Sequence, residues 1–131
     1  MVSRRMSNAE LVTLAEKPAE VAQAKVIRAA AVETAAWVRL KCQYGCDGFH
    51  QCLTCPPFTP TPEQMRQVLD GYRRAVLVRF KDYANIKAVM VKLERTVFLK
   101  GAWKAFGLGA GPCELCEACV CRVGQCRNGQ N

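Results

Sequence analysis

The 131-residue sequence has few of the features that identify most enzymes and membrane proteins. It contains one histidine, His50, no Ser–His–Asp arrangement and no phosphate-binding P-loop pattern. No run of about 18 uncharged apolar residues is present, so we expect no membrane span. No block of five or six like charges occurs, because the lysines and arginines are spread along the chain. We therefore do not expect an enzyme with one of these recognised catalytic patterns.

The N-terminal stretch also lacks the apolar core of a secretory signal, because Glu10 and Glu16 follow soon after its basic residues. We therefore expect a cytoplasmic protein. In a reducing compartment, clustered cysteines hold metals or act in catalysis more often than they form disulfides. The sequence has nine cysteines, and an odd number argues against a fully paired disulfide framework.

Composition and charge indicate a small globular protein without an obvious polyanionic partner. Half of the residues are hydrophobic, and the length suits one domain over residues 1–131. The formal net charge is +8 with neutral thiols. A four-thiolate site with zinc or a doubly positive iron–sulfur core carries about −2, so two such sites leave roughly +4. Nucleic acid is therefore not an expected partner.

The N-terminal half predicts one helix and one strand before a cysteine-rich loop. Residues 7–23 show a helical pattern that Pro18 interrupts. The next stretch is ambiguous, since its alanines favour helix while WVRL favours strand, and we predict a short strand over residues 36–40. The strand leads into the loop KCQYGCDGFHQCLTCPPFTPTP.

The second half predicts two helices that flank a strand. Thr61 and Gln64 form a capping box at the start of the first helix. A buried strand follows over residues 75–80, and a helix over residues 84–106 is kinked or ended by Gly101. The predicted fold is a small α+β domain, with helices on a short sheet and two cysteine-rich loops at one edge.

Five cysteines gather near the C-terminus, in GPCELCEACVCRVGQC. The first three, Cys113, Cys116 and Cys119, recur every third residue, a spacing that turns successive sulfurs towards one centre. We predict a 4Fe–4S cluster with Cys126 as the fourth ligand. Cys121 is then a spare thiol, because it follows Cys119 by two positions. A zinc knuckle is the alternative, although zinc more often uses two separate hooks.

A second group of four cysteines lies within fourteen residues, and two prolines follow it. Its members are Cys42, Cys46, Cys52 and Cys55. The spacing differs from the C-x-x-x-C-x-x-C of radical enzymes that cleave S-adenosylmethionine, so we do not expect that chemistry. A second 4Fe–4S cluster, a zinc ion and a site shared with the first group all remain open.

Other residues near the cysteines have simpler interpretations. His50 lies inside the first-occurring group, where it is a loop histidine or a replacement ligand. The run GLGAG lacks the strand that precedes a dinucleotide-binding site, so we expect Gly107, Gly109 and Gly111 to bring backbone amides close to the cluster. We expect Trp37 to pack in the core or to shield the cluster, and Trp103 to do the same.

Four stretches together resemble a known family: WVRLKCQYGC, CLTCPPFTPTPEQ, AVLVRF and FLKGAWKAFGLGAGPCELCEACVC. The family consists of small cysteine-rich prokaryotic proteins that are predicted to bind metal and have no settled activity. The likeness covers residues 38–126. It implies a ferredoxin-like half-motif at the later cysteines, and it matches the earlier group at Cys42, Cys46 and Cys55 while leaving Cys52 open. Relatives continue beyond the last cysteine, so we expect that residues 1–131 lack a C-terminal tail.

These observations favour an iron–sulfur protein that transfers electrons or senses redox state, with an unidentified redox protein as its partner. A zinc-stabilised interaction module is the second hypothesis. The third is metal delivery through the spare thiol Cys121, or an enzyme with an open cluster site. The sequence favours a non-enzymatic role, and it does not indicate an oligomeric state.

Overall fold

A computed structural model describes residues 5–82, 84–111, 113, 116 and 126. The chain forms two compact units: Met1–Arg28 with Arg74–Ala110, here called the sheet unit, and Ala29–Arg73 with Gly111–Asn131, here called the cysteine unit. Helices and a two-stranded antiparallel sheet make the fold α+β, as predicted. The prediction of one domain over residues 1–131 stays a prediction. None of the described helices is long and apolar enough to cross a membrane.

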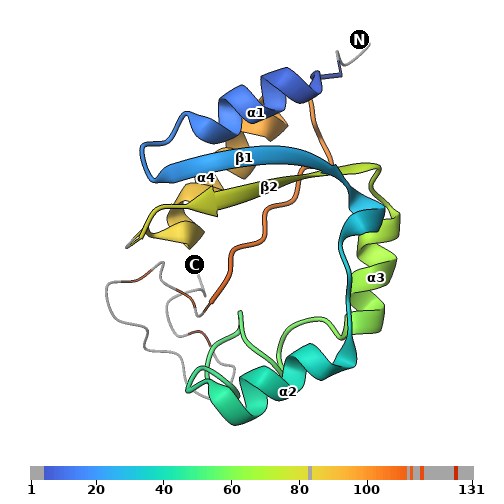
Figure 1. Ribbon diagram of the computed structural model, residues 1–131, viewed down its shortest axis with the longest axis vertical. Coiled ribbons are helices and arrows are strands. Elements are labelled where there is room, and N and C mark those ends of the chain that lie inside the picture. The colour runs from blue at the N-terminus through green and yellow to red at the C-terminus, as the bar shows by residue number, and fades with distance from the viewer. Residues whose placement is uncertain (1–4, 83, 112, 114–115, 117–125, 127–131) are drawn as a thin grey trace. The chain divides into compact units, whose positions relative to one another are not determined.

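The sheet unit begins with helix α1, Asn8–Glu16 (Figure 1). The Ser7 hydroxyl accepts a hydrogen bond from the Glu10 N–H at 3.1 Å, and the Glu10 carboxylate accepts one from the Ser7 N–H at 2.7 Å. The helix ends before Pro18, since proline cannot donate the backbone hydrogen bond that would continue it. The helix predicted over residues 7–23 is therefore too long, because its last residues belong to a strand.

The sheet pairs strand β1, Val21–Arg28, with strand β2, Arg74–Phe80, in antiparallel fashion. The register places Lys25 opposite Leu77. Residues that lie directly opposite each other in an antiparallel pair have their side chains on the same face of the sheet, so Lys25 and Leu77 share one face. The strand predicted over residues 75–80 is confirmed, but it is not buried throughout, because Leu77 is 61 % exposed.

Helix α4, Ile86–Leu99, lies behind the sheet in Figure 1. The Asn85 side chain caps its start by accepting a backbone N–H at 3.1 Å. At its end, Gly101 has a φ of 103° and donates its N–H to the carbonyl of Phe98 at 2.9 Å. The helix predicted over residues 84–106 is thus shorter than expected. Of the two roles predicted for Gly101, ending the helix is the one observed.

The sheet unit has an apolar core to which α1, β1 and α4 contribute. Its buried side chains are Met6, Leu11, Ala15, Val21, Ala24 and Val89. Arg74 ties β2 to the start of α1, since its guanidinium donates to Asn8 Oδ1 at 2.7 Å and to the Met6 carbonyl at 2.6 Å. Burial, together with the positive charge of Arg5, lowers the pKa of Arg74 from its usual value.

The cysteine unit contains a 3₁₀ turn, η1 (Ala29–Ala31), and two helices, α2 (Ala36–Gly45) and α3 (Pro62–Asp70). The strand predicted over residues 36–40 is wrong, because these residues form the first half of α2. A strand needs a pairing partner, and among the described residues β1 and β2 pair with each other. Within residues 24–40, Trp37 to Leu40 are helical, whereas Ala24 lies in strand β1.

Polar contacts, rather than apolar packing, hold α3 to the start of the cysteine unit. The predicted capping box is confirmed, with Gln64 N–H to Thr61 Oγ1 at 3.1 Å and Thr61 N–H to Gln64 Oε1 at 2.8 Å. One turn later, the Arg66 guanidinium donates to the carbonyls of Val32 and Ala29. These hydrogen bonds join α3 to η1.

Candidate metal centre

Two of the earlier cysteines lie at the C-terminal end of α2. Cys42 belongs to the helix and is half-buried, while Cys46 is the exposed residue that ends it. The Cys46 N–H donates to the Cys42 carbonyl at 3.2 Å. Cys42 was expected in a loop that follows a strand, and its position in a helix corrects that prediction. A rigid helix end fixes the backbone of this pair.

The other two earlier cysteines form a tight turn. The Cys55 N–H donates to the Cys52 carbonyl at 3.0 Å, and the Phe58 N–H donates in turn to the Cys55 carbonyl at 3.1 Å. The Cys52 residue is 8 % exposed and Cys55 is 7 % exposed. A C-x-x-C turn of this kind is the usual hook by which proteins present two thiolates to one metal.

Two contacts shape the loop around this turn. The His50 N–H donates to the Pro56 carbonyl at 2.8 Å, which joins the two sides of the loop. From α2, the Arg39 guanidinium donates to the carbonyls of Thr59 at 2.8 Å and Pro60 at 3.1 Å. Arg39 therefore connects the helix that carries Cys42 to the segment that leaves Cys55. Its role was not expected, because a single arginine in a helix carries no sequence signal for such a contact.

His50 adopts a left-handed backbone conformation with a φ of 64°. Its ring is exposed and lies edge-to-face with Phe58, with ring centroids 5.3 Å apart, and near Phe49 at 6.3 Å. These aromatic contacts agree with a loop histidine. The alternative, in which His50 replaces a cysteine ligand, stays a prediction.

The later cysteine group belongs to the same compact unit as the earlier one. Cys113, Cys116 and Cys126 are half-buried, whereas Cys119 and Cys121 lie outside the described residues. The structure places no disulfide among the seven described cysteines. The predicted ligands of the earlier group and those of the later group therefore belong to the same unit of the chain.

The donor chemistry of the cysteine unit suits a thiophilic metal, because its described cysteines are not paired in disulfides and Cys52 and Cys55 are buried. A complete shell needs about four such ligands. Within the described ranges, no three histidine, cysteine or acidic side chains come close enough to hold an ion. The structure therefore does not bring three of the earlier cysteines, Cys42, Cys46, Cys52 and Cys55, to one point. Of the later candidates, Cys119 and Cys121 lie outside the described residues.

A hollow of about 330 Å³ in the cysteine unit is not the metal site. It is lined by residues of η1, the start of α2, and Arg66 of α3. None of its lining residues is a cysteine or histidine. Trp37 forms part of its wall and is 60 % exposed, so the prediction that this tryptophan packs in a core is wrong.

Gly107 and Gly109 of the run GLGAG contact α4 in the sheet unit. The Gly107 N–H donates to Glu94 Oε2 at 2.7 Å, and the Gly109 carbonyl accepts from Lys87 Nζ at 2.7 Å. A Cβ on Gly109 would lie 2.8 Å from Lys87 Cδ, so a larger residue there would displace the Lys87 side chain. The amide of Gly107 is given to a carboxylate rather than to a cluster sulfur, which corrects the prediction for Gly107, while the prediction for Gly109 and Gly111 stays a prediction.

Comparison with known families gives one match. A family model described as "Predicted metal-binding protein (DUF2284)" matches residues 25–131, and the chain belongs to this family. No curated protein and no solved structure matches the chain. The match agrees with the resemblance drawn from the cysteine motifs, and it covers both cysteine groups.

Proposed function

We propose that this member of a family of predicted metal-binding proteins is an iron–sulfur protein of the 4Fe–4S type. Its ligands to one cluster are Cys113, Cys116, Cys119 and Cys126. The remaining four cysteines, from Cys42 to Cys55, hold either a second cluster or a zinc ion. When bound, such a cluster supplies one-electron transfer. The protein then passes electrons to a redox protein partner, or senses redox state, in the cytoplasm.

The observation that supports metal binding most strongly is the burial of thiols in a unit with little else inside it. In the described part of the cysteine unit, the buried apolar residues are Ala29, Cys52 and Cys55. The sheet unit, in contrast, buries several side chains of ordinary core residues. A small unit with few buried side chains among its described residues is typically held together by a disulfide or a metal, and the structure places no disulfide among its described cysteines.

The chain's own residues prepare the thiols for a metal. The turn from Cys52 to Cys55 brings the backbones of the two cysteines together through the hydrogen bond from the Cys55 N–H to the Cys52 carbonyl. Arg39 holds the exit of this loop to the helix that carries Cys42. These contacts define the backbone around the earlier group.

A zinc-stabilised interaction module is the second candidate, and the earlier group favours it more than the later one does. The Cys52–Cys55 hook, with a separate pair at the end of α2, matches the two-hook arrangement common in structural zinc sites. In this case zinc holds the cysteine unit together and carries no electrons.

Anaerobic titration with dithionite tests the proposed role. The protein is purified without oxygen, and its visible absorption is followed while reductant and then oxidant are added. We expect reversible bleaching that takes up one electron per cluster. A protein whose spectrum does not respond to either reagent would rule out electron transfer and leave the zinc module.

A further inference from the structure

The last residues of α4 and the segment that follows them expose several large apolar side chains. In residues 98–108, here called the aromatic loop, Trp103 is 77 % exposed, Phe106 is 58 % and Phe98 is 51 %. Leu99 and Leu108 are exposed as well. The prediction that Trp103 packs in a core does not fit this exposure, while its alternative, that Trp103 shields a cluster, stays a prediction. Exposed aromatic residues that lie this close together usually mark a binding surface.

The aromatic loop has a defined backbone. Its first turn is a Schellman motif, in which the N–H groups of Gly101 and Ala102 donate to the carbonyls of Phe98 and Val97 at 2.9 and 3.2 Å. The Ala105 N–H then closes a second turn onto the Ala102 carbonyl at 2.9 Å. Trp103 and Lys104 are the two central residues of that turn.

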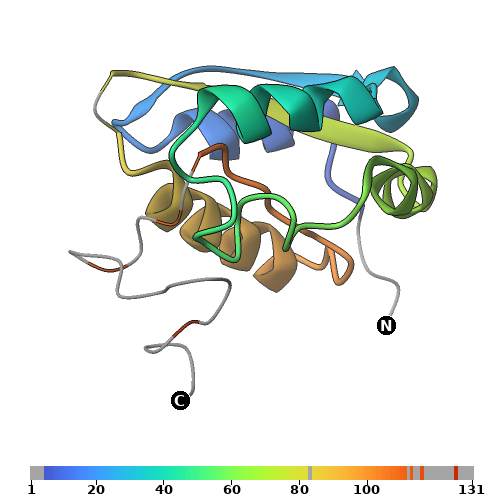
Figure 2. The same ribbon diagram turned by 90° about the horizontal axis from the view of Figure 1, so that it is seen from below.

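The far end of the aromatic loop is fastened to α4. The chain returns along this helix (Figure 2), where Glu94 accepts the Gly107 N–H and Lys87 donates to the Gly109 carbonyl. Hydrogen bonds at both ends hold the loop in place. A surface that is ordered before binding loses less conformational entropy when its partner arrives.

The exposed charged side chains in residues 95–108 are all positive. Arg95, Lys100 and Lys104 are exposed, and the sequence has no aspartate or glutamate between Glu94 and Glu114. The Glu94 carboxylate itself accepts the Gly107 N–H. This segment therefore combines exposed cationic side chains with exposed aromatic rings.

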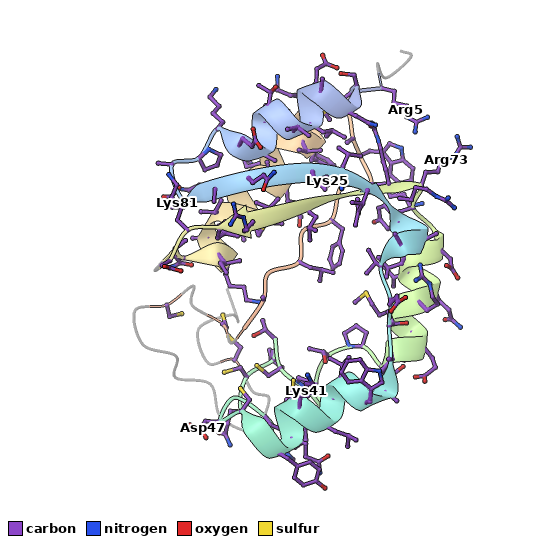
Figure 3. The ribbon with its side chains drawn as sticks, viewed as in Figure 1. Arg5, Lys25, Lys41, Asp47, Arg73 and Lys81 are labelled. Carbon is purple, nitrogen blue, oxygen red and sulfur yellow. The ribbon has the colours of Figure 1, made fainter. Side chains whose placement is uncertain are left out.

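The net charge of the chain belongs to the sheet unit as a whole. Its two segments contain 13 of the 19 lysines and arginines but 5 of the 11 acidic residues, so its sequence carries +8. The cysteine unit contains the other six of each and carries zero. Figure 3 shows Lys25 and Lys81 on the sheet unit, and Lys41 with Asp47 on the cysteine unit.

This separation changes the argument about polyanionic partners. The expectation against nucleic acid rested on a charge averaged over the chain and lowered by metal-bound thiolates. Those thiolates would all lie in the cysteine unit, so metal binding leaves the +8 of the sheet unit unchanged.

We propose that the aromatic loop, with Arg95, binds single-stranded nucleic acid. Unpaired bases stack on exposed aromatic rings, and lysine and arginine side chains neutralise the phosphates between them. An acidic protein would satisfy the cations but would supply few flat groups for Trp103. This inference goes beyond the proposed function, and it does not depend on which metal the cysteine unit holds.

Fluorescence anisotropy with a labelled oligothymidine of about 12 nucleotides tests the proposal on the protein as purified. Trp103→Ala is expected to weaken binding by about 5- to 150-fold, because it removes one stacking ring. Trp103→Phe should recover part of the loss. Trp37→Ala is the matched control, since Trp37 is also exposed and lies beside Lys41 but belongs to the charge-neutral unit. It should bind as the parent protein does.

Two further readouts separate stacking from simple charge attraction. In the Trp37→Phe variant, Trp103 is the remaining tryptophan, and its fluorescence should be quenched by the oligonucleotide. Lys100→Ala should reduce the slope of log affinity against log salt by about one. Circular dichroism confirms that each variant is folded.

Three results would overturn the proposal. The first is unchanged affinity in a folded Trp103→Ala variant. The second is displacement of the oligonucleotide by polyglutamate as readily as by unlabelled oligonucleotide, which would indicate an acidic protein partner. The third is binding to phosphatidylserine vesicles without binding to the oligonucleotide, which would indicate a lipid surface.

Discussion

At the scale of single residues, the cysteines differ in how the fold treats them. Cys52 and Cys55 are buried in a tight turn, Cys42 is half-buried in α2, and Cys46 is exposed at the end of that helix. A thiol on the surface costs little to leave unliganded, while a buried pair held by a turn is positioned for a shared partner. Burial therefore separates the hook cysteines from the exposed one.

The proposed ligand assignment predicts opposite effects for two cysteines five positions apart. Cys116→Ser should abolish cluster binding at the later group, because it removes a ligand from the run of three. Cys121→Ser should leave cluster binding intact, since Cys121 is the proposed spare thiol. Iron and sulfide content of the two purified variants, relative to the parent protein, is the measurement. An equal loss of iron in both variants would show that the assignment is incorrect.

At the scale of helices and strands, local hydrogen bonds decide where several elements begin. Thr61 and Gln64 start α3 by a reciprocal cap, and α3 in turn carries Arg66, which bonds to the carbonyl of Val32. The cap thus supports a helix that has no buried side chains of its own. Stability in this part of the cysteine unit depends on such polar contacts.

Removing this cap should weaken the cysteine unit measurably. Thr61→Ala is expected to lower the free energy of unfolding by about 1 kcal/mol, because the N–H of Gln64 loses its partner. Thr54→Ala is the matched control, since Thr54 is an exposed threonine in the same unit. Urea denaturation of the metal-loaded protein, followed by circular dichroism, compares the two. A loss of the same size in both variants would contradict the role given to the cap.

The elements that could be predicted from the sequence are those fixed by neighbouring residues. The cap at Thr61 and the helix end at Gly101 depend on residues within a few positions, so their patterns were visible. Strand β1 was missed because its alanines favour helix, and its pairing with β2 joins residues far apart in the chain. The strand predicted over residues 36–40 is wrong for a related reason, because the local preference of WVRL for strand does not show whether a pairing partner exists.

In the candidate site, too, local patterns could be predicted from the sequence, whereas contacts between distant residues could not. The cysteine groups were visible because ligand spacing is a local property, and the family match agrees with them. The contacts of Arg39 with Thr59 and Pro60, and of Gly107 with Glu94, connect residues more than ten positions apart and had no sequence signal. The exposure of Trp103 was equally invisible, because tryptophan is more often buried.

At the scale of the whole molecule, the two units differ in what stabilises them. The sheet unit has an apolar core, while the described residues of the cysteine unit bury Ala29 and two hook cysteines. Charge divides in the same way, with the excess of lysine and arginine in the sheet unit. We infer that metal binding stabilises one unit far more than the other.

Metal removal should therefore loosen one unit and spare the other. After chelation, backbone amides of α2 and α3 should lose protection against hydrogen exchange, because a metal-bound state contributes directly to folding free energy. Amides of β1 and β2 should keep their protection. Hydrogen exchange followed by mass spectrometry of peptides from both units makes the comparison. Uniform loss across the two units would show that they unfold together, and unchanged protection in α2 and α3 would argue against a structural metal.

The most direct test of the central claim, that the cysteines hold iron–sulfur clusters, is elemental analysis of anaerobically purified protein together with its visible spectrum. Iron, acid-labile sulfide and zinc are quantified on one sample. We expect a broad visible absorption band with equal amounts of iron and sulfide, at about four of each per cluster. A colourless protein with stoichiometric zinc and no sulfide would contradict the claim.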